Sequence, residues 1–409
     1  MAGPQPSGPL GHIKVLELSR VLAGPWAAQT LADLGADVVK VERPGTGDDT
    51  RTWGPPWAGE GADRQAAYFL STNRGKRSVT IDFERPEGQE LVRTLAAQAD
   101  VVIENFKVGG LKKYGLDYDS LKAVNPRLVY CSVTGFGQTG PYAPRAGYDF
   151  MIQGLGGLMS ITGLPDGEPG GGPVKVGVAV TDVFTGLYAT IGIMGALAHR
   201  DRTGEGQAVD MALLDVQVAI LANQAMNYLV SEKAPQRLGN AHPNIVPYQA
   251  FPTRDGHVII AIGNNGQFAK FCGAAGRPDL LEDPRFANNE ARVAHRAEMV
   301  AILTEVMGTR STRDWLDVLE PLGVPVGPIN DLKAVFEDPQ VQARGLRRDL
   351  PHPVIGSVPT VANPIRYSAT PLVHDRAPPM LGADTDAVLG GQLGLSAADI
   401  AALRDKGVI

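Results

Sequence analysis

Short apolar runs alternate with helical patterns along the first half of the chain. The apolar runs cover residues 13–18, 37–42, 78–82, 100–104 and 127–133. Helical patterns lie between them, over 24–34, from about Pro86 and around Ser120. Strands that alternate with helices predict a parallel sheet with helices on both faces. The first half therefore predicts an α/β fold.

The second half changes character at a long, nearly uncharged helical pattern. The elements that it predicts are a helix over 183–198, a strand over 207–211, a helix over 213–229, a hairpin of 248–252 with 257–262, helices to about 321, extended chain at 325–329, strands at 346–350 and 365–368, and a terminal helix over 397–404. Residues 151–172 are rich in glycine and poor in charge, which is typical of a loop. Such a loop lies beside a ligand or simply on the surface, and both interpretations stay open.

Length and charge narrow the class of protein. A chain of 409 residues exceeds what one core usually organises, so we expect two domains, with a crossing near 239–247. The net charge is -6 and the basic residues are scattered, which argues against nucleic acid as a partner. Cys131 and Cys272 stand far apart without Cys or His ligand spacing, so we expect no disulfide and no metal site.

Targeting signals are missing from the printed sequence. The first ten or so residues lack the pattern of a signal peptide, and no apolar run is long enough to span a bilayer. We expect a cytoplasmic protein that does not bind membranes, with a loosely ordered start.

The ends of the predicted strands outline one binding rim. Parallel sheets bind ligands beyond the carboxyl ends of their strands, and Arg20, Arg43 and Phe106 follow three of these runs. No G-x-G-x-x-G follows the first run, so the dinucleotide fingerprint is absent. Cations with aromatic side chains suit phosphates and a flat ring. Each cation taken singly also fits a solvated surface charge.

One acid stands at a junction of particular interest. Asp182 follows a stretch of small residues, over 176–181, and precedes the long helical pattern. An Asp at such a place accepts hydrogen bonds from unpaired backbone N–H groups as a helix N-cap. The same carboxylate, if it faces a cleft, acts as a nucleophile. These residues alone leave both roles open.

A series of short motifs, in order along nearly the whole chain, resembles the class III CoA-transferase family. The matching pieces are Val15-Leu16-Glu17-Leu18, Ala23-Gly24-Pro25, Leu34-Gly35-Ala36-Asp37, Asn73-Arg74-Gly75-Lys76-Arg77-Ser78, Glu104-Asn105-Phe106, Ser132-Val133-Thr134-Gly135-Phe136-Gly137, Gly147-Tyr148-Asp149, Thr181-Asp182 and Arg202-Thr203-Gly204-Glu205-Gly206-Gln207. The ordered set carries the resemblance, because any single piece would be weak.

The resemblance implies both a fold and a site. It implies a Rossmann-like large domain over 1–225, a smaller α+β domain over 226–330, a return segment over 331–409 that completes the large domain, and two subunits interlocked as a homodimer. It makes Asp182 the catalytic carboxylate and coenzyme A a substrate and product, with no tightly bound cofactor and no metal. The CoA site that it implies comprises Arg20, Val21, Ala23, Arg43, Ile81, Asn105, Phe106, Lys113, Arg145, Tyr148 and Asp149.

The chemistry implied for Asp182 is covalent relay. Its carboxylate attacks a bound acyl-CoA to form a mixed anhydride, and the released thiolate converts the anhydride to an aspartyl-CoA thioester. An acceptor carboxylate then reverses the sequence. We expect the helix dipole to keep Asp182 ionised at neutral pH.

The middle of the chain resembles the branch of this family that exchanges CoA between succinate and glutarate. The resemblance lies in residues 239–251 and in Gly263-Asn264-Asn265, where the consecutive glycines of formyl-CoA transferases are absent. The branch implies small dicarboxylic acids as donor and acceptor. Arg237, His242 and Asn264 are the candidate substrate residues, against plain structural roles in a loop.

Three other functions are weighed against CoA transfer. An α-methylacyl-CoA racemase needs a second acid/base, and where that family has His in the Gly-x-Asp segment this chain has Tyr148, which otherwise packs in a core. A non-catalytic acyl-CoA-binding protein would have no need of Asp182. A nicotinamide oxidoreductase is disfavoured by the missing glycine fingerprint.

Overall fold

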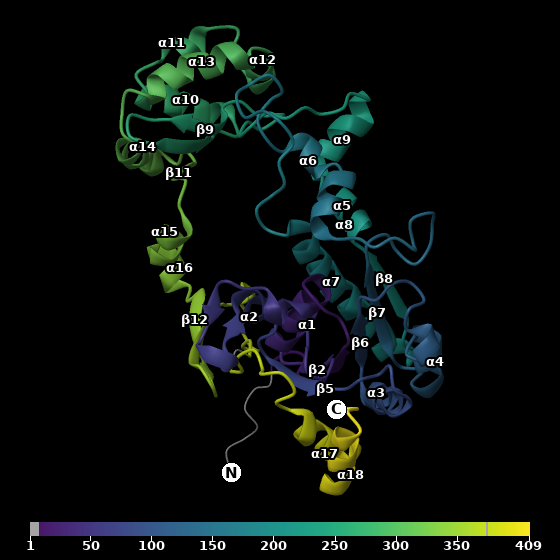
Figure 1. The fold of residues 1–409 in the computed structure, drawn as a ribbon. Coiled ribbons are helices and arrows are strands. Elements are labelled where there is room, and N and C mark those ends of the chain that lie inside the picture. Colours follow the sequence, from purple (N-terminus) through teal and green to yellow (C-terminus); the bar gives the residue numbers. More distant parts are fainter. Residues whose placement is uncertain (1–7, 374) are drawn as a thin grey trace. The chain divides into compact units, whose positions relative to one another are not determined.

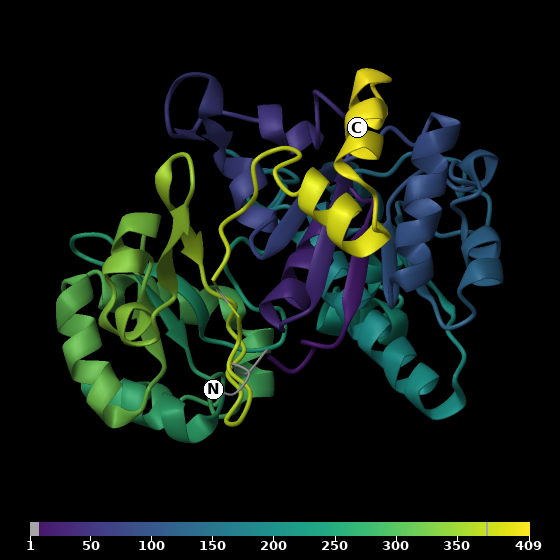
Figure 2. The same ribbon diagram turned by 90° about the horizontal axis from the view of Figure 1, so that it is seen from below.

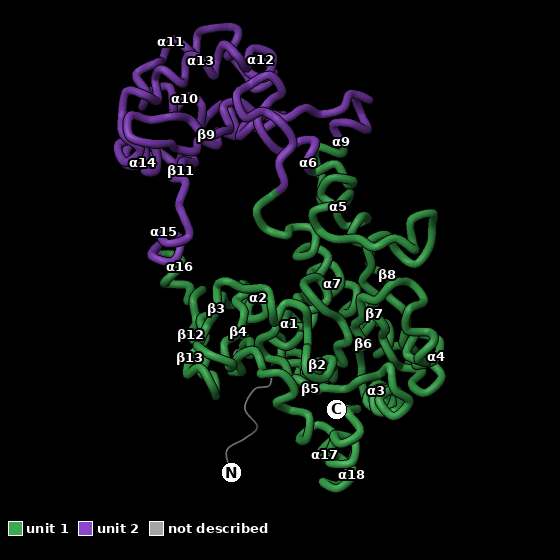
Figure 3. The backbone as a smooth tube through the Cα atoms, viewed as in Figure 1, with its two compact units in different colours: residues 1–158, 176–225, 340–409 green, residues 159–175, 226–339 purple. Residues whose placement is uncertain are grey.

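The computed structural model describes residues 8–373 and 375–409, and this part of the chain divides into two compact units (Figure 3). Unit 1 takes the chain up to Leu158, then Val176–Ala225 and Gln340–Ile409, and unit 2 takes Met159–Lys175 and Met226–Pro339. The predicted large domain ran unbroken over 1–225, so the excursion of 159–175 into unit 2 is a difference. Of the start expected to be loosely ordered, residues 1–7 lie outside the described residues.

The core of unit 1 is a parallel sheet (Figure 1). Its strands, among the described residues, are β1 (Lys14–Glu17), β2 (Asp37–Glu42), β5 (Lys76–Thr80), β6 (Val101–Glu104), β7 (Val129–Thr134) and β8 (Ala208–Ala212), in the order β5-β2-β1-β6-β7-β8. The chain therefore runs outward from β1 to one edge and then outward from β6 to the other, as in doubly wound folds. Such sheets bind ligands where the direction reverses, here between β1 and β6.

Helices cover both faces of this sheet because successive strand residues point to opposite sides. Val15 belongs to the core formed with α1 and α7, whereas Leu16 belongs to the core formed with α3, α4, α17 and α18. These helices are α1 (Ala23–Asp33), α3 (Pro86–Gln98), α4 (Tyr118–Val124), α7 (Val180–Thr203), α17 (Thr385–Leu393) and α18 (Ala397–Asp405). Figure 2 shows the two C-terminal helices, in yellow, beside the strands of the N-terminal half. The end of the chain thus returns to unit 1.

Some of the smaller elements were predicted from the sequence pattern and others were not. They are β3 (Trp57–Ala58), β4 (Gln65–Ala66), α2 (Ala67–Thr72), α5 (Asp149–Leu155), α6 (Leu158–Ile161), α8 (Leu213–Ala219), α9 (Ala222–Ser231), α16 (Pro339–Ala343), β12 (Arg347–His352) and β13 (Gly356–Val361). Helices α5 and α6 replace much of the predicted loop over 151–172. The helix predicted over 213–229 is broken, because Ala222 has a φ of 47°. The strand predicted over 365–368 was wrong, since β12 pairs with β13 instead.

Helix α7 is the longest of these helices, and its two sides differ. Its buried residues include Ala189 and Ile193, which pack with α1 and the sheet. Within the described part of the chain, α7 is also the one helix long and apolar enough to cross a membrane by length and composition. That is weak support for a span, because core helices meet the same criterion.

Unit 2 is built on an antiparallel sheet that confirms the predicted hairpin. Its strands are β9 (Tyr248–Pro252), β10 (His257–Ala261) and β11 (Val326–Pro328), and its helices are α10 (Asn265–Ala274), α11 (Asp279–Glu282), α12 (Asn289–Ala294), α13 (Arg296–Met307), α14 (Thr312–Leu319) and α15 (Leu332–Glu337). The core centres on Trp315, which is fully buried and donates its indole N–H to the Met307 carbonyl at 2.9 Å.

Candidate active site

The segments that follow β1 and β6 are tied together at the point where the sheet reverses direction. The backbone N–H of Arg20 donates to Oδ1 of Asn105 at 2.9 Å, and Nδ2 of Asn105 donates to the Arg20 carbonyl at 2.7 Å. Because the two strands are neighbours, this reciprocal pair fixes the floor of the crevice that the topology predicts.

Two cavities open over this floor, and both belong to unit 1. The first, of about 270 Å³, contains Asp182 and is called the Asp182 cavity. Its lining includes the predicted residues Arg20, Val21, Ala23, Asn105, Phe106, Arg145, Tyr148 and Asp182. The structure therefore brings together candidates from the ends of three strands and from the start of α7. Tyr148 is 68% exposed, so it is not a core residue.

The second cavity, of about 390 Å³, holds the remaining predicted cations and is called the Arg43 cavity. Its lining includes the predicted residues Arg43, Ile81 and Lys113, and it shares Arg20 and Phe106 with the Asp182 cavity. Phe83 and Tyr114 also line it, and the rings of Phe106 and Tyr114 each lie 5.7 Å from that of Phe83. Exposed cations around an aromatic cluster suit phosphates and a flat ring.

Phe83 and Tyr114 are residues that the sequence interpretation missed. Phe83 directly follows the predicted strand over 78–82, so the strand-end rule that found Phe106 also applied to it. Lys107 lines both cavities and was not among the predicted site residues, although it directly follows Phe106. Tyr114 had no such signal, because it lies in a short 3₁₀ turn away from any strand end.

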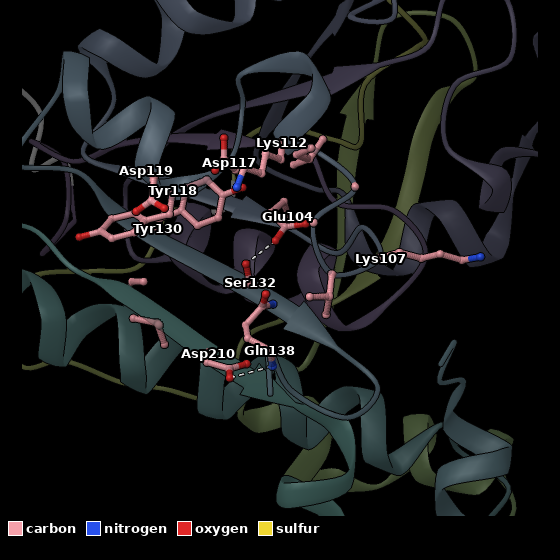
Figure 4. A pocket seen from close by; sticks show the side chains of 16 residues that line it. Glu104, Lys107, Lys112, Asp117, Tyr118, Asp119, Tyr130, Ser132, Gln138 and Asp210 are labelled. Atoms are coloured by element: carbon pink, nitrogen blue, oxygen red, sulfur yellow. Dashed lines mark hydrogen bonds between the residues drawn. The ribbon is translucent and has the colours of Figure 1, made fainter. Parts of the chain in front are cut away.

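A third cavity, of about 320 Å³, is lined by the loop after β6 and by residues of β7 and β8 (Figure 4). Figure 4 shows the carboxylate of Glu104 pointing toward Ser132, whose hydroxyl donates to it. The same carboxylate accepts the backbone N–H of Phe106 at 2.7 Å. Burial raises the pKa of Glu104 to about 7, against the opposing effect of these hydrogen bonds. Glu104 thus supports the loop that carries Asn105 and Phe106.

Asp182 lies in the first turn of α7 and is not its N-cap. The N-cap residue is Ala179, which has no side-chain capping bond. Instead Asp149 caps the helix, since its Oδ2 accepts the N–H of Thr181 at 2.9 Å and that of Asp182 at 3.3 Å. The capping alternative for Asp182 was therefore wrong, and the Asp182 carboxylate is free of that task. Asp149, expected in the CoA site, is not among the residues that line either cavity.

Asp182 is also less acidic than the helix dipole alone would make it. Burial, followed by the negative charge of Asp149, raises the pKa of Asp182 to about 7. The expectation that the dipole keeps Asp182 ionised at neutral pH was wrong, because desolvation and a like charge outweigh the dipole and leave the group partly protonated there. A carboxylate with a raised pKa in a cavity is typical of a functional group. Burial, then the charges of Asp182 and Asp149, also raises the pKa of Tyr68, a residue that the sequence did not single out.

A close backbone contact sets the position of Asp149. A Cβ at Gly147 would lie 2.4 Å from the Cα of Gly135, so neither glycine tolerates a side chain without movement. Gly135 follows β7, and Gly147 stands two residues before Asp149. This contact holds the segment with Tyr148 and Asp149 against the end of the sheet.

The three candidate substrate residues all belong to unit 2, and each has a local role there. Arg237 pairs with Asp166 and donates to two backbone carbonyls at 3.3 Å. Nδ1 of His242 accepts the N–H of Asn244 at 3.1 Å, and burial, helped by Arg296, lowers the pKa of His242. The side chain of Asn264 caps α10. A role of these residues in substrate binding stays a prediction.

Comparisons with known proteins identify the family. A family model described as CoA-transferase family III matches residues 10–385. Within the described part of the chain, no cluster of His, Cys, Asp and Glu suited to a metal is found. The chain is 56% identical to a succinate–glutarate CoA-transferase of Agrobacterium fabrum, over 93% of this chain and 94% of that protein. It is 44% identical to a succinyl-CoA:glutarate CoA-transferase of Homo sapiens, over 98% and 90%. The crystal structure of a CAIB/BAIF family protein from Brucella suis matches with a TM-score of 0.83 at 56% identity, over 94% and 99%. The chain therefore belongs to CoA-transferase family III.

Proposed function

We propose that this CoA-transferase moves CoA from succinyl-CoA to glutarate and that Asp182 is the covalent relay. The observation that carries the proposal is a carboxylate of raised pKa in a cavity beside a rim of cations and aromatic rings. The relatives from Agrobacterium fabrum and Homo sapiens, whose names give succinate or succinyl-CoA with glutarate, support the choice of substrates.

The proposed reaction proceeds by two exchanges at one carboxylate. Asp182 attacks the thioester carbon of succinyl-CoA, which breaks the C–S bond and gives an aspartyl–succinyl anhydride and CoA thiolate. The thiolate attacks the aspartyl carbonyl, which releases succinate and leaves an aspartyl-CoA thioester. Glutarate then attacks the aspartyl carbonyl of the thioester, which breaks the C–S bond and gives an aspartyl–glutaryl anhydride and CoA thiolate. The thiolate attacks the glutaryl carbonyl of this anhydride and expels the Asp182 carboxylate. The products are glutaryl-CoA and the original Asp182 carboxylate.

The cavities divide the work of binding. Arg43, Lys107 and Lys113 offer charge for the phosphates of CoA, and the cluster of Phe83, Phe106 and Tyr114 offers apolar surface for its base. Holding the thioester beside Asp182 makes the attack effectively intramolecular. A raised pKa makes the carboxylate a stronger base and hence a better nucleophile once it is ionised.

The lining of the Asp182 cavity also bears on the racemase alternative. Moving a proton across an α-carbon needs a second acid/base, for which His is the usual choice. None of the described residues lining the Asp182 cavity is a His. CoA transfer needs no such partner, because the carboxylate itself forms the covalent bond.

Asp182→Ala tests the proposal directly. We expect exchange of labelled glutarate into glutaryl-CoA to fall by about 10³-fold or more, as when other nucleophiles are removed, while CoA binding measured by calorimetry is kept. The matched control is Asp201→Ala, an exposed acid at the other end of α7 that pairs with Arg200. Hydroxylamine added during turnover should label Asp182, seen by mass spectrometry of the peptide. Full turnover by Asp182→Ala would refute the relay.

We also propose that the protein is a homodimer, because an exposed apolar stripe runs along α7. The stripe consists of Phe184, Leu187, Tyr188, Ile191 and Met194, which follow the spacing of one helix face. Contiguous apolar surface of this kind marks an interaction site. Light scattering after size exclusion should give twice the mass of one chain, and a monomer would contradict the proposal.

A further inference from the structure

Val21 has a backbone conformation that its side chain disfavours. Its φ is 72°, in the left-handed region, where a β-branched residue is a genuine outlier. The residue lines the Asp182 cavity and directly precedes the N-cap of α1, Leu22. Strain of this kind persists only where the surroundings over-determine the backbone, and it gathers at functional sites.

The turn before α1 is held at each residue. The Ser19 carbonyl accepts from Nζ of Lys40 at 2.7 Å. Arg20 makes its two reciprocal bonds with Asn105, at 2.9 and 2.7 Å. The N–H of Val21 lies 3.2 Å from each carboxylate oxygen of Asp48. Of these three sets of contacts, the one between Val21 and Asp48 acts on the strained residue itself.

Asp48 is itself fixed by a buried group of charges. Nζ of Lys40 lies 3.0 Å from Asp48 and 3.1 Å from Glu17, and Nζ of Lys76 lies 2.8 Å from Glu17. These four side chains are almost fully buried, and their two positive and two negative charges balance. The N–H and hydroxyl of Thr50 also donate to Asp48, at 3.0 and 2.8 Å. The acceptor for Val21 therefore cannot turn away without breaking a buried ion pair.

The start of α1 in turn bears on the position of Asp182. Gly186 lies one turn after Asp182 on α7, and a Cβ there would come within 2.7 Å of the Ala23 carbonyl and 2.9 Å of the Trp26 side chain. The first turn of α1 and the second turn of α7 are thus in direct contact. A change in the backbone at Val21 would move the wall of the cavity relative to the carboxylate.

We propose that Asp48, anchored by Lys40, is a positioning residue that holds Val21 in the left-handed conformation and so sets the start of α1 against Asp182. The proposal rests on the function proposed above for Asp182. Asp48 and Lys40 also line the Arg43 cavity, but the role proposed here for Asp48 is to position Val21 and not to bind substrate. Asp48 acts through Val21, and the group of charges below serves to keep its carboxylate in place.

The test is rescue of Asp48→Asn by glycine at position 21. Asn has one acceptor oxygen where Asp has two, so its amide nitrogen must face either Lys40 or the N–H of Thr50. Both carboxylate positions lie 3.2 Å from the N–H of Val21, so the amide nitrogen would also set a donor against that N–H. We expect kcat for exchange to fall at least tenfold in Asp48→Asn. Adding Val21→Gly should recover most of that loss, because glycine adopts a positive φ without strain. Adding Val21→Ala shortens the side chain but keeps a Cβ, so it should recover much less.

Each result has a definite meaning. Unchanged kcat in Asp48→Asn, or equal recovery by Ala and Gly, overturns the proposal. If Asp48→Asn does not fold, folding and turnover regained with Val21→Gly support it, and a double variant that also fails to fold overturns it. A wild-type enzyme that exchanges no CoA between succinate and glutarate counts against the proposed function instead. In that case the recovery of thermal stability by Gly but not Ala still tests the hold on Val21.

Discussion

Replacing Asp182 by Asn should stabilise the folded protein while it removes the nucleophile. The carboxylate is buried beside Asp149, and these two effects raise its pKa from 3.8 to about 7. Between these two values the folded chain keeps a proton that the unfolded chain has lost. The stability of the wild type therefore falls as the pH rises through this window, and that of Asp182→Asn has no such loss.

The size of the effect follows from the two pKa values. Each unit of difference between the folded and unfolded pKa corresponds to about 1.4 kcal/mol. The free energy of unfolding of the wild type is therefore lower by about 4 kcal/mol at pH 8, but by under about 2 kcal/mol at pH 5. Because the entropy of unfolding is about 2.1 cal/mol/K per residue, 1 kcal/mol corresponds to about 1 °C in a chain of 409 residues. The variant should thus melt about 4 °C above the wild type at pH 8, and the gap should shrink by half or more at pH 5.

Thermal unfolding of both proteins at several pH values between 5 and 8 measures this gap. Asp119→Asn is a matched control, because Asp119 is an exposed carboxylate in the first turn of α4. Its removal takes away a favourable interaction with the helix dipole and should cost about 0.3–1 kcal/mol, opposite in sign. A gap between Asp182→Asn and the wild type that stays constant from pH 5 to 8 would refute the raised pKa of Asp182.

Three further predictions concern the surroundings of Asp182 and the frame of unit 1. Asp149→Asn should shift the acidic limb of the pH profile of kcat/KM downward, because it removes the negative charge that raises the pKa of Asp182; an unmoved limb would contradict this. Gly147→Ala should lower kcat, since its Cβ would lie 2.4 Å from the Cα of Gly135, whereas Gly195→Ala, which has open space in α7, should be neutral in the same assay. Asp33→Ala should destabilise the protein in urea by about 3–5 kcal/mol, because it leaves the buried guanidinium of Arg74 without the carboxylate that it binds at 2.8 and 2.6 Å; a loss below 1 kcal/mol would show that Arg74 finds another partner.

Much of unit 1 could be predicted because its strands are short apolar runs bounded by turns. The strand over Asp37–Glu42 was confirmed at both ends, and the runs around β1, β6 and β7 were confirmed within a few residues. The rule that ligands bind beyond such strand ends then placed Arg20, Asn105 and Phe106 on one rim, and they do line one cavity. Local pattern suffices here, since burial on both faces imposes a continuous apolar run.

Prediction failed where distant segments decide the outcome. β13 was missed because its pairing with β12 depends on a turn that the Pro-rich composition obscured. The local sequence of residues 159–175 does not indicate that they belong to unit 2. Phe83 was also missed, but it directly follows a predicted strand, so the local pattern was sufficient to predict it as a site residue.

The sequence by itself determined the order of the elements, the family resemblance and the importance of Asp182. Only the tertiary structure decided what Asp182 is like as an acid. Its pKa depends on burial and on Asp149, which stands 33 residues earlier and takes over the capping of α7. The conformation of Val21 likewise depends on Asp48, 27 residues later. Electrostatic and hydrogen-bonding effects act through space, so they exist only after contacts such as that between Gly135 and Gly147 have brought these groups together.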